Sequence, residues 1–147
     1  MIEMNIKVKK LTDSAIIPSR ETKGAAGVDL SADINEPVII RPHETVKIPT
    51  NLAMELPEGT VGFIAARSGL ATKEGLRPAN CLGVMDLDYR GNYIVSLHND
   101  SDETRIVKPE QRIAQLLIMP CIFANFVECD ELSETKRGSG GFGSTGK

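Results

Sequence analysis

The stretch IAQLLIM, residues 113–119, is apolar along almost its whole length. A short apolar run of this kind is typical of a β-strand that is buried on both faces, within the chain or partly between subunits. Similar runs cover residues 38–40, 63–66 and 93–97, whereas LAMEL at residues 52–56 alternates with a period of two. Alternation is the pattern of a half-buried strand in an antiparallel sheet. Together these stretches predict an all-β domain.

The spacing of the strands narrows the architecture. Short strands about 8 to 12 residues apart favour a sandwich, jelly roll or barrel, because these arrangements leave few exposed sheet edges. Only SGLATKE at residues 68–74 has helical character, with Ser68 as the N-cap and Gly75 as the C-terminal stop. We therefore expect a β-barrel or sandwich with one short helix.

Length and composition narrow the class of protein. The chain has 147 residues, 41% of them hydrophobic and 25% charged, as in one globular domain. A net charge of −3 argues against broad electrostatic binding to nucleic acid or to an anionic membrane. Cys81, Cys121 and Cys129 are odd in number and widely spaced, which favours a reducing compartment. With no signal peptide or membrane-length apolar run in the sequence, we expect a cytoplasmic protein that binds neither nucleic acid nor membrane.

The composition changes after Leu132. Residues 133–147 contain five of the 13 glycines and a single aromatic residue, Phe142. We therefore expect a β domain over residues 1–132 and a flexible, glycine-rich C-terminal arm over residues 133–147. On composition alone, such an arm is a disordered terminus.

The arm matches two phosphate-binding patterns only superficially. GSGGFG at residues 138–143 fits G-x-G-x-x-G but does not begin a βαβ unit, and GFGSTGK at residues 141–147 lacks the final Ser or Thr of a Walker A motif. Successive glycines still allow backbone N–H groups to form an anion-binding nest, and Arg137 adds a fork suited to phosphate. Phe142 has no local apolar partner, which favours stacking on a base. The arm is a candidate lid over a nucleotide.

Two further segments carry candidate functional groups. In GVMDLDYRG, residues 83–91, Asp86 and Asp88 share one face if the segment is extended. Three interpretations are open: a charged hairpin turn, a metal-binding pair, or a general-base aspartate with Tyr89 as neighbour. No His or Glu stands at ligand spacing beside the pair, which argues against a metal site. In ARSGL, residues 66–70, an arginine and a serine stand at the predicted start of the helix. This arrangement suits an anion-binding helix N-terminus, or equally an ordinary N-cap with a solvated arginine.

Five segments taken in order resemble the five motifs of the trimeric dUTP pyrophosphatases (dUTPases): AGVDL (26–30), RSG (67–69), GVMDLDYRG (83–91), RIAQL (112–116) and RGSGGFGSTG (137–146). The resemblance spans almost the whole chain. It implies a jelly-roll β-barrel that assembles as a homotrimer, with active sites shared between subunits. It also implies hydrolysis of dUTP to dUMP and pyrophosphate, which prevents uracil incorporation into DNA and supplies dUMP for dTMP synthesis. The Mg²⁺ cofactor would be held mainly by the triphosphate, with no protein metal ligand.

The resemblance also implies roles for individual residues. Asp86 would be the catalytic base that orients and deprotonates the water attacking the α-phosphorus. Tyr89 would lie against the deoxyribose and exclude a 2′-hydroxyl, while Asn80 and the hairpin backbone at Gly83 would bind uracil. Asp29 would support the site through hydrogen bonds. The other implied substrate-binding residues are Arg67, Ser68, Gly69 and Gln115 on the phosphates, Arg137, Gly143, Ser144 and Thr145 in the closing arm, and Phe142 stacked on uracil.

Small departures from the family pattern remove no reacting group. Ala66 stands where a proline is frequent, Val28 where a larger residue is common, and Met85 where isoleucine is usual. Two other functions stay open at this point. One is a dCTP deaminase, which resembles dUTPases in fold but attacks the base. The other is a regulatory protein that senses a nucleotide through ordering of the arm.

Overall fold

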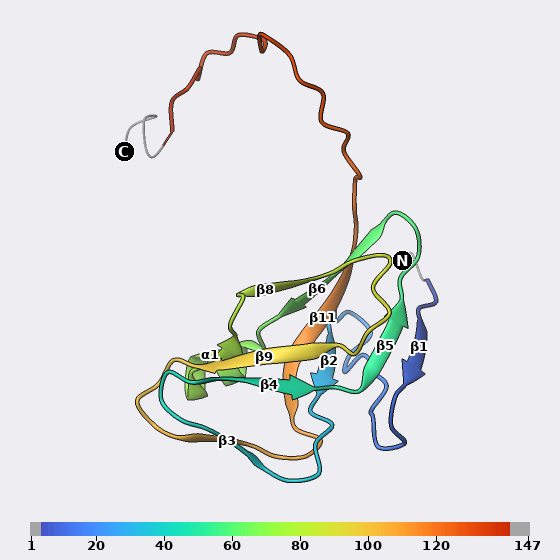
Figure 1. Ribbon diagram of the computed structural model, residues 1–147, viewed down its shortest axis with the longest axis vertical. Coiled ribbons are helices and arrows are strands. Elements are labelled where there is room, and N and C mark those ends of the chain that lie inside the picture. The colour runs from blue at the N-terminus through green and yellow to red at the C-terminus, as the bar shows by residue number, and fades with distance from the viewer. Residues whose placement is uncertain (1–3, 142–147) are drawn as a thin grey trace.

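The computed structural model describes residues 4–141, which form strands around one apolar core together with one short helix (Figure 1). The elements are β1 (Lys7–Lys10), β2 (Val28–Ser31), β3 (Val38–Ile40), β4 (Thr45–Pro49), β5 (Leu52–Glu55), β6 (Thr60–Ala65), α1 (Ser68–Glu74), β7 (Leu76–Pro78), β8 (Leu82–Met85), β9 (Ile94–Asn99), β10 (Arg105–Val107) and β11 (Arg112–Pro120). The prediction of an all-β fold with one short helix is confirmed.

The strands pair antiparallel in four sheets. The largest has the order β2-β11-β6-β8, and a three-stranded sheet has the order β4-β9-β7. Two ribbons, β1-β5 and β10-β3, complete the set within the described residues. Because β11 pairs with both β2 and β6, it joins segments that lie far apart in the sequence.

The inward faces of these strands supply the core. Leu30, Ile48, Tyr93, Leu97 and Ile113 are fully buried. Burial of each such side chain stabilises the fold by about 1.5–3 kcal/mol relative to exposure. Along β6 and β9 buried residues alternate with more exposed ones, as expected for strands with one face on the core.

The predicted burial of residues 113–119 on both faces, part of it between subunits, is seen within the single chain only at the start of β11. Ile113 and Ala114 at the start of β11 are fully buried, but Leu117 is only half-buried and Met119 is exposed. These two side chains lie on the outer face of the four-stranded sheet, which no other segment of the described chain covers to the same extent as the inner face. The apolar run therefore indicates a surface as well as a core.

The helix α1 begins one residue earlier than a cap at Ser68 would require. The N-cap is Arg67, with φ −80° and ψ 122° and no side-chain cap, so Ser68 is already helical and cannot cap. Gly75 ends the helix with φ 70°, a left-handed conformation that glycine adopts most readily. Its N–H donates to the Ala71 carbonyl at 3.1 Å.

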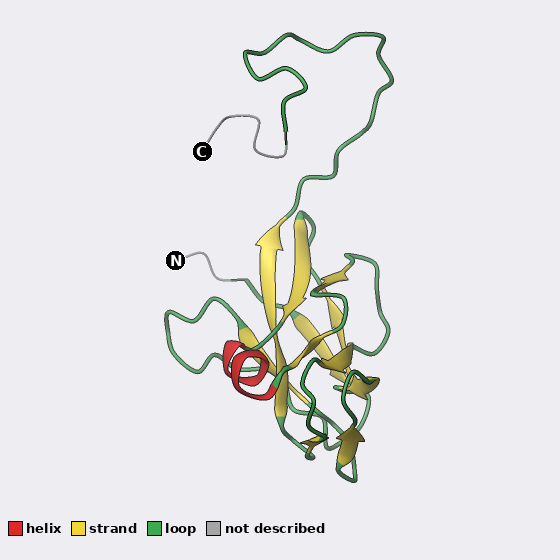
Figure 2. Ribbon diagram, turned by 90° about the vertical axis from the view of Figure 1, so that its left-hand side faces the viewer, coloured by secondary structure: helices red, strands yellow, loops and turns green. Residues whose placement is uncertain are grey.

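After β11 the chain leaves the body of the molecule, and residues 121–141, the extended tail, run away from the sheets (Figures 1 and 2). The tail contains no strand or helix among its described residues, and nearly all of its side chains are exposed. The predicted division at residue 132 stays a prediction. No helix in the described part of the chain is long and apolar enough to cross a membrane.

Candidate active site

One row of paired residues crosses the four-stranded sheet near the end of β6. Asp29 of β2 pairs with Gln115 of β11, Gln115 pairs with Ala65 of β6, and Ala65 pairs with Leu82 of β8. Neighbouring strands lie about 4.8 Å apart, so the row brings four distant sequence segments together. The segments 26–30, 66–69, 80–83 and 112–116 therefore meet at one end of this sheet.

Charged side chains gather at the β2 side of this row. Asp29 Oδ1 accepts a hydrogen bond from Arg67 Nε at 3.0 Å, and Arg112 Nη1 lies 3.1 Å from Asp29 Oδ2. The Asp29 carboxylate is 17% exposed and sits between the two guanidinium groups. Arg112 also donates to Glu21 Oε1 at 2.6 Å. We call Asp29, Arg67 and Arg112 the arginine cluster; it fixes the direction of Arg67, whose remaining N–H groups are suited to phosphate.

Gln115 ties the end of β6 to the row. Its Nε2 donates to the Ala66 carbonyl at 2.8 Å, next to Arg67. A Cβ on Gly27 would lie 2.6 Å from Gln115 Oε1, so the glycine leaves the space that this side chain occupies. Ser68 and Gly69 follow Arg67 in the first turn of α1 and are both exposed. Their backbone N–H groups, like those of any first helical turn, have no acceptor within the helix.

A pocket of about 100 Å³ opens between β8 and β9. Asn80 and Gly83 line it together with Met85, Ile94 and Ser96. Gly83 is buried, and a Cβ there would lie 3.4 Å from Asn80 Nδ2, so the Asn80 amide sits directly against this backbone. We call this pocket the hairpin pocket, after the segment 80–91, for which the sequence predicts a hairpin. It combines apolar walls with one side-chain amide and backbone polar groups, which is a composition suited to a small flat ligand.

The acidic turn, residues 86–91, follows the other end of β8. Tyr89 N–H donates to the Asp86 carbonyl at 3.2 Å, which closes the turn. Asp86, Asp88 and Tyr89 are all exposed, and the Tyr89 hydroxyl donates to the Asn92 carbonyl at 3.0 Å. The Asp86 side chain therefore has open solvent in front of it, where a water or a ligand can approach.

A chain of amide hydrogen bonds anchors the acidic turn to the body. Asn92 Nδ2 donates to Asn51 Oδ1 at 2.7 Å, and Asn51 Nδ2 donates to Asp33 Oδ2 at 2.8 Å. Burial raises the pKa of Asp33, but hydrogen bonds from Thr12, Ser14 and Asn51 outweigh burial and hold this pKa below its usual range. Asp33 is therefore a charged anchor for the turn.

A single chain does not bring all the predicted site residues together. Met85, just before Asp86, pairs with Gly62, three residues along β6 from Ala65 in the row. Asp86 lies four positions beyond Leu82, about 13 Å at the rise of an extended strand. Arg137 lies in the extended tail, where its Nε donates to the Gly140 carbonyl at 2.8 Å. Phe142, Gly143, Ser144 and Thr145 lie outside the described residues.

Sequence reasoning missed Arg112 as a site residue, although it stands in a quoted motif. The register of β11 shifts between Arg112 and Ala114, which is the mark of a bulge that re-aims a side chain. A bulge has no signature in hydrophobic alternation. The pairing with Glu21, which lies 91 residues away, is equally invisible in the chain order.

The chain matches known proteins over almost its full length. The family model for dUTPase matches residues 13–146, so the chain belongs to the dUTPase family. The protein named deoxyuridine 5'-triphosphate nucleotidohydrolase from Desulfitobacterium hafniense (strain DSM 10664 / DCB-2) is 47% identical over 146 residues, which is 99% of this chain and 97% of that protein. The family that the five segments resemble is confirmed.

Solved structures agree with this assignment. The Staphylococcus bacteriophage 80alpha dUTPase with dUPNHPP has a TM-score of 0.84 and 30% identity, covering 97% of this chain and 99% of that chain. A mutant dUTPase from phage phi11 of S. aureus, described as revealing the coordination of a structural Mg(II) ion, has a TM-score of 0.81 and 25% identity, covering 89% of this chain and 100% of that chain.

Proposed function

We propose that this protein is a dUTP nucleotidohydrolase, an enzyme that hydrolyses dUTP to dUMP and pyrophosphate. The observation that carries the proposal is the row Asp29–Gln115–Ala65–Leu82, which brings segments 26–30, 66–69, 80–83 and 112–116 to one end of the four-stranded sheet in a chain of the dUTPase family. The product dUMP would serve dTMP synthesis, and removal of dUTP would keep uracil out of DNA. The cysteine composition supports a cytoplasmic location.

Phosphate binding falls to the arginine cluster and its neighbours. Arg67, pre-oriented by Asp29, offers N–H groups to the phosphate oxygens, and the exposed Ser68 hydroxyl and Gly69 backbone lie beside it. Because Asp29 holds Arg67 in place before the ligand arrives, little side-chain entropy is lost on binding. Gln115 keeps the backbone at Ala66 in position.

Water attack falls to Asp86. Its exposed carboxylate accepts a proton from water as the water oxygen bonds to the α-phosphorus; the bond from that phosphorus to the β-phosphate bridging oxygen breaks, and pyrophosphate leaves in line. An aspartate has a reference pKa near 3.9, so its basicity alone is weak at neutral pH. Positioning and charge neutralisation by the arginine cluster must supply most of the rate enhancement.

Base and sugar selection would depend on Asn80, Gly83 and Tyr89. Asn80 and the backbone at Gly83 present a donor and acceptor pattern for the uracil edge inside the pocket. Tyr89, in the acidic turn that follows β8, is the residue that would pack on the deoxyribose and leave no room for a 2′-hydroxyl.

The chain's donor set fits Mg²⁺ carried by the substrate. Among residues 4–141 no group of three His, Cys, Asp or Glu side chains is close enough to hold a metal ion. Mg²⁺ commonly binds to substrate phosphates and keeps several of its waters, so it needs no dedicated cage of protein ligands. Bound through the triphosphate, Mg²⁺ would neutralise phosphate charge.

Two apolar surfaces support assembly as a homotrimer with shared sites. On the outer face of the four-stranded sheet, Leu82, Val84 and Met119 are exposed. In the extended tail, Ile122 is 92% exposed and Phe126 is 97% exposed. Large apolar surfaces of this kind mark association sites. In such an assembly the acidic turn of one copy meets the arginine cluster of another, and an arm carrying Arg137, Phe142, Gly143, Ser144 and Thr145 closes the site.

Pyrophosphate release tests the proposal. Purified protein with Mg²⁺ is given dUTP, dTTP, dCTP and UTP separately, and Asp86→Asn serves as the matched control. We expect pyrophosphate from dUTP with strong preference, and little from the variant. Ammonia release from dCTP would indicate a deaminase. Tight dUTP binding without turnover by the wild-type chain would indicate a regulatory nucleotide sensor. Sedimentation or light scattering of the same sample tests the trimer.

A further inference from the structure

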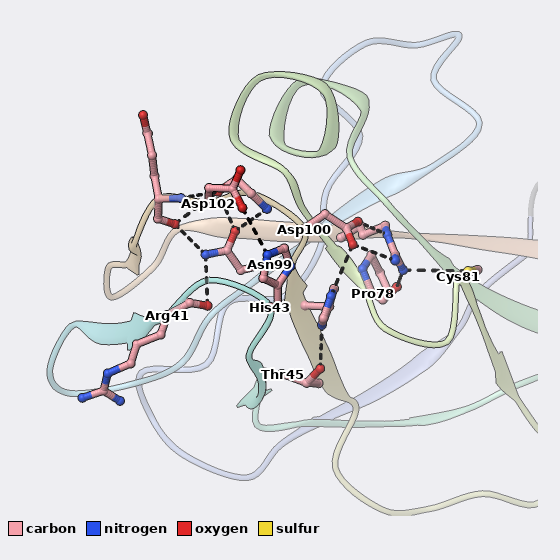
Figure 3. Close-up of polar contacts among 12 residues, drawn as sticks. Arg41, His43, Thr45, Pro78, Cys81, Asn99, Asp100 and Asp102 are labelled. Atoms are coloured by element: carbon pink, nitrogen blue, oxygen red, sulfur yellow. Dashed lines mark hydrogen bonds and ion pairs between the residues drawn. The ribbon is translucent and has the colours of Figure 1, made fainter.

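The turn that carries Asn80 is held from outside the pocket by an ion pair. Arg77, in β7, donates from Nη2 to Asp100 Oδ1 at 3.0 Å and from Nε to the other carboxylate oxygen. This two-pronged contact ties β7 to the residue that follows β9 (Figure 3). A fork of this kind fixes both the distance and the orientation of the guanidinium.

The same guanidinium reaches into the turn itself. Arg77 Nη1 donates to the Pro78 carbonyl at 3.2 Å and lies 3.9 Å from Cys81 Sγ. Cys81 has a φ of 58°, a left-handed conformation that residues with a side chain rarely adopt. The turn is therefore strained at the residue next to Asn80, and Arg77 contacts it on both sides of Asn80.

A second layer holds Asp100. His98 Nε2 lies 3.3 Å from Asp100 Oδ1, and the other ring nitrogen of His98 lies 2.8 Å from Thr45 Oγ1 (Figure 3). The hydrogen bond and the positive charge of Arg77 hold the pKa of Asp100 below its usual value. The carboxylate therefore stays ionised and keeps accepting from Arg77.

The pair is too exposed to matter much for global stability. The side chains of Arg77 and Asp100 are 35% and 43% exposed, and ion pairs with that exposure contribute little to folding. The contacts of Arg77 converge instead on the short turn of residues 78–81. This turn contains Asn80, whose Nδ2 lies beside Gly83 in the hairpin pocket.

We propose that Arg77 and Asp100 are positioning residues for base recognition. The pair holds the strained turn at Cys81, and so fixes the Asn80 amide against Gly83 where the base is read. This inference rests on the proposed function, in which Asn80 binds uracil. When the pair is broken, the turn relaxes and the amide loses its fixed position. Binding and base selection weaken, while Asp86 and the arginine cluster keep their own contacts.

Steady-state kinetics with base competition tests the inference. The variants are Arg77→Lys, which keeps the charge but loses the fork, and Asp100→Asn; the matched control is Glu55→Gln, which breaks the exposed Lys7–Glu55 pair on another ribbon. We expect KM for dUTP to rise about three- to tenfold in both variants, with kcat nearly unchanged and weaker discrimination against dCTP. The double exchange Arg77→Asp with Asp100→Arg should recover part of the loss.

Amide hydrogen exchange gives a readout that is independent of turnover. In both variants exchange at residues 79–82 should accelerate, while the melting temperature stays close to that of Glu55→Gln. Unchanged KM and unchanged exchange would overturn the inference, as would a fall in kcat and melting temperature with KM unaltered. Wild-type protein that releases no pyrophosphate from dUTP would instead refute the proposed function. This result is distinguishable from failure of the inference on Arg77 and Asp100, because it is obtained with the wild-type protein alone.

Discussion

Two edges of the four-stranded sheet carry opposite kinds of functional group. On the β2 side, the arginine cluster is internally paired: Asp29 binds Arg67 and Arg112 through contacts of 3.0 and 3.1 Å. Beyond the Met85 end of β8, the acidic turn holds Asp86 through backbone bonds only, and the carboxylate faces solvent. The first region is fixed before a ligand arrives, whereas the second lacks the partners that its chemistry needs.

This difference supports the proposal that the active site takes residues from more than one copy of the chain. Anion-binding groups that are paired in advance lose little entropy on binding, so one chain can hold them ready. A carboxylate close to these arginines in the same chain would pair with them and lose its availability to water. Asp86 lies about 13 Å along the strand direction from Leu82, at the opposite edge of the sheet from Asp29, and this separation prevents that pairing. Assembly can then bring the two regions together around a substrate.

The largest loss of activity is expected from a substitution of Asp86 in the acidic turn. Asp86→Asn keeps the shape of the acidic turn but removes the base, so kcat for dUTP should fall about 10²–10⁴-fold while nucleotide binding persists. Asp88→Asn, two positions along the same turn, is the matched control and should retain most of the activity. Stopped-time pyrophosphate release measures kcat, and calorimetry measures binding. Near-normal turnover by Asp86→Asn would remove this residue from the mechanism.

Mixing variants tests the separation of the two regions directly. Asp86→Asn and Arg67→Ala are each expected to be nearly inactive. Refolded together, random assembly should restore activity in about one quarter of the sites, because a site can then take its base from one chain and its arginine from another. A mixture of Asp86→Asn with Asp86→Ala is the control without recovery. Failure of the first mixture to recover would place both regions in one chain's site.

The strands, the helix and most of the site residues could be predicted from the sequence, but their arrangement in space could not. Apolar periodicity located the strands, and Gly75 ended the helix as expected, because these features depend on near neighbours. The separation of Asp86 from Arg67 depends on the register of β8 against β6, which no local pattern encodes. The contacts of Arg112 and Arg77 could not be predicted for the same reason, since their partners Glu21 and Asp100 are distant in the chain.

A smaller effect is expected from loosening the arginine cluster. Asp29→Asn removes the charge that holds Arg67 and Arg112 close together, so Arg67 loses its orientation. We expect kcat/KM for dUTP to fall about 10- to 100-fold, the range for hydrogen bonds to charged groups. Glu21→Gln, which contacts only Arg112, should have a weaker effect. Equal effects of the two variants would show that Arg112, and not Arg67, carries the phosphate contact.

A smaller change still is expected at Gly27. In Gly27→Ala the new Cβ would lie 2.6 Å from Gln115 Oε1, which is the end of a flexible side chain and can move. Stability should change little, but the hydrogen bond from Gln115 to Ala66 should weaken and KM should rise about threefold. Gly24→Ala, where nothing lies within 4 Å of the new Cβ, is the matched control. A KM increase in both variants would point to the loop backbone instead.

The anchor of the acidic turn should make stability depend on pH. The pKa of Asp33 is lower in the folded chain than its usual value of 3.8, so its contribution is present above that value and is lost as pH falls through the folded pKa. Asp33→Asn removes this contribution. Its melting temperature should lie below that of the wild type at neutral pH, and the two curves should converge below about pH 4. Asp88→Asn, on the exposed turn, should follow the wild-type curve throughout. A constant gap between Asp33→Asn and the wild type at all pH values would show that Asp33 anchors the turn through shape alone, with its charge playing no part.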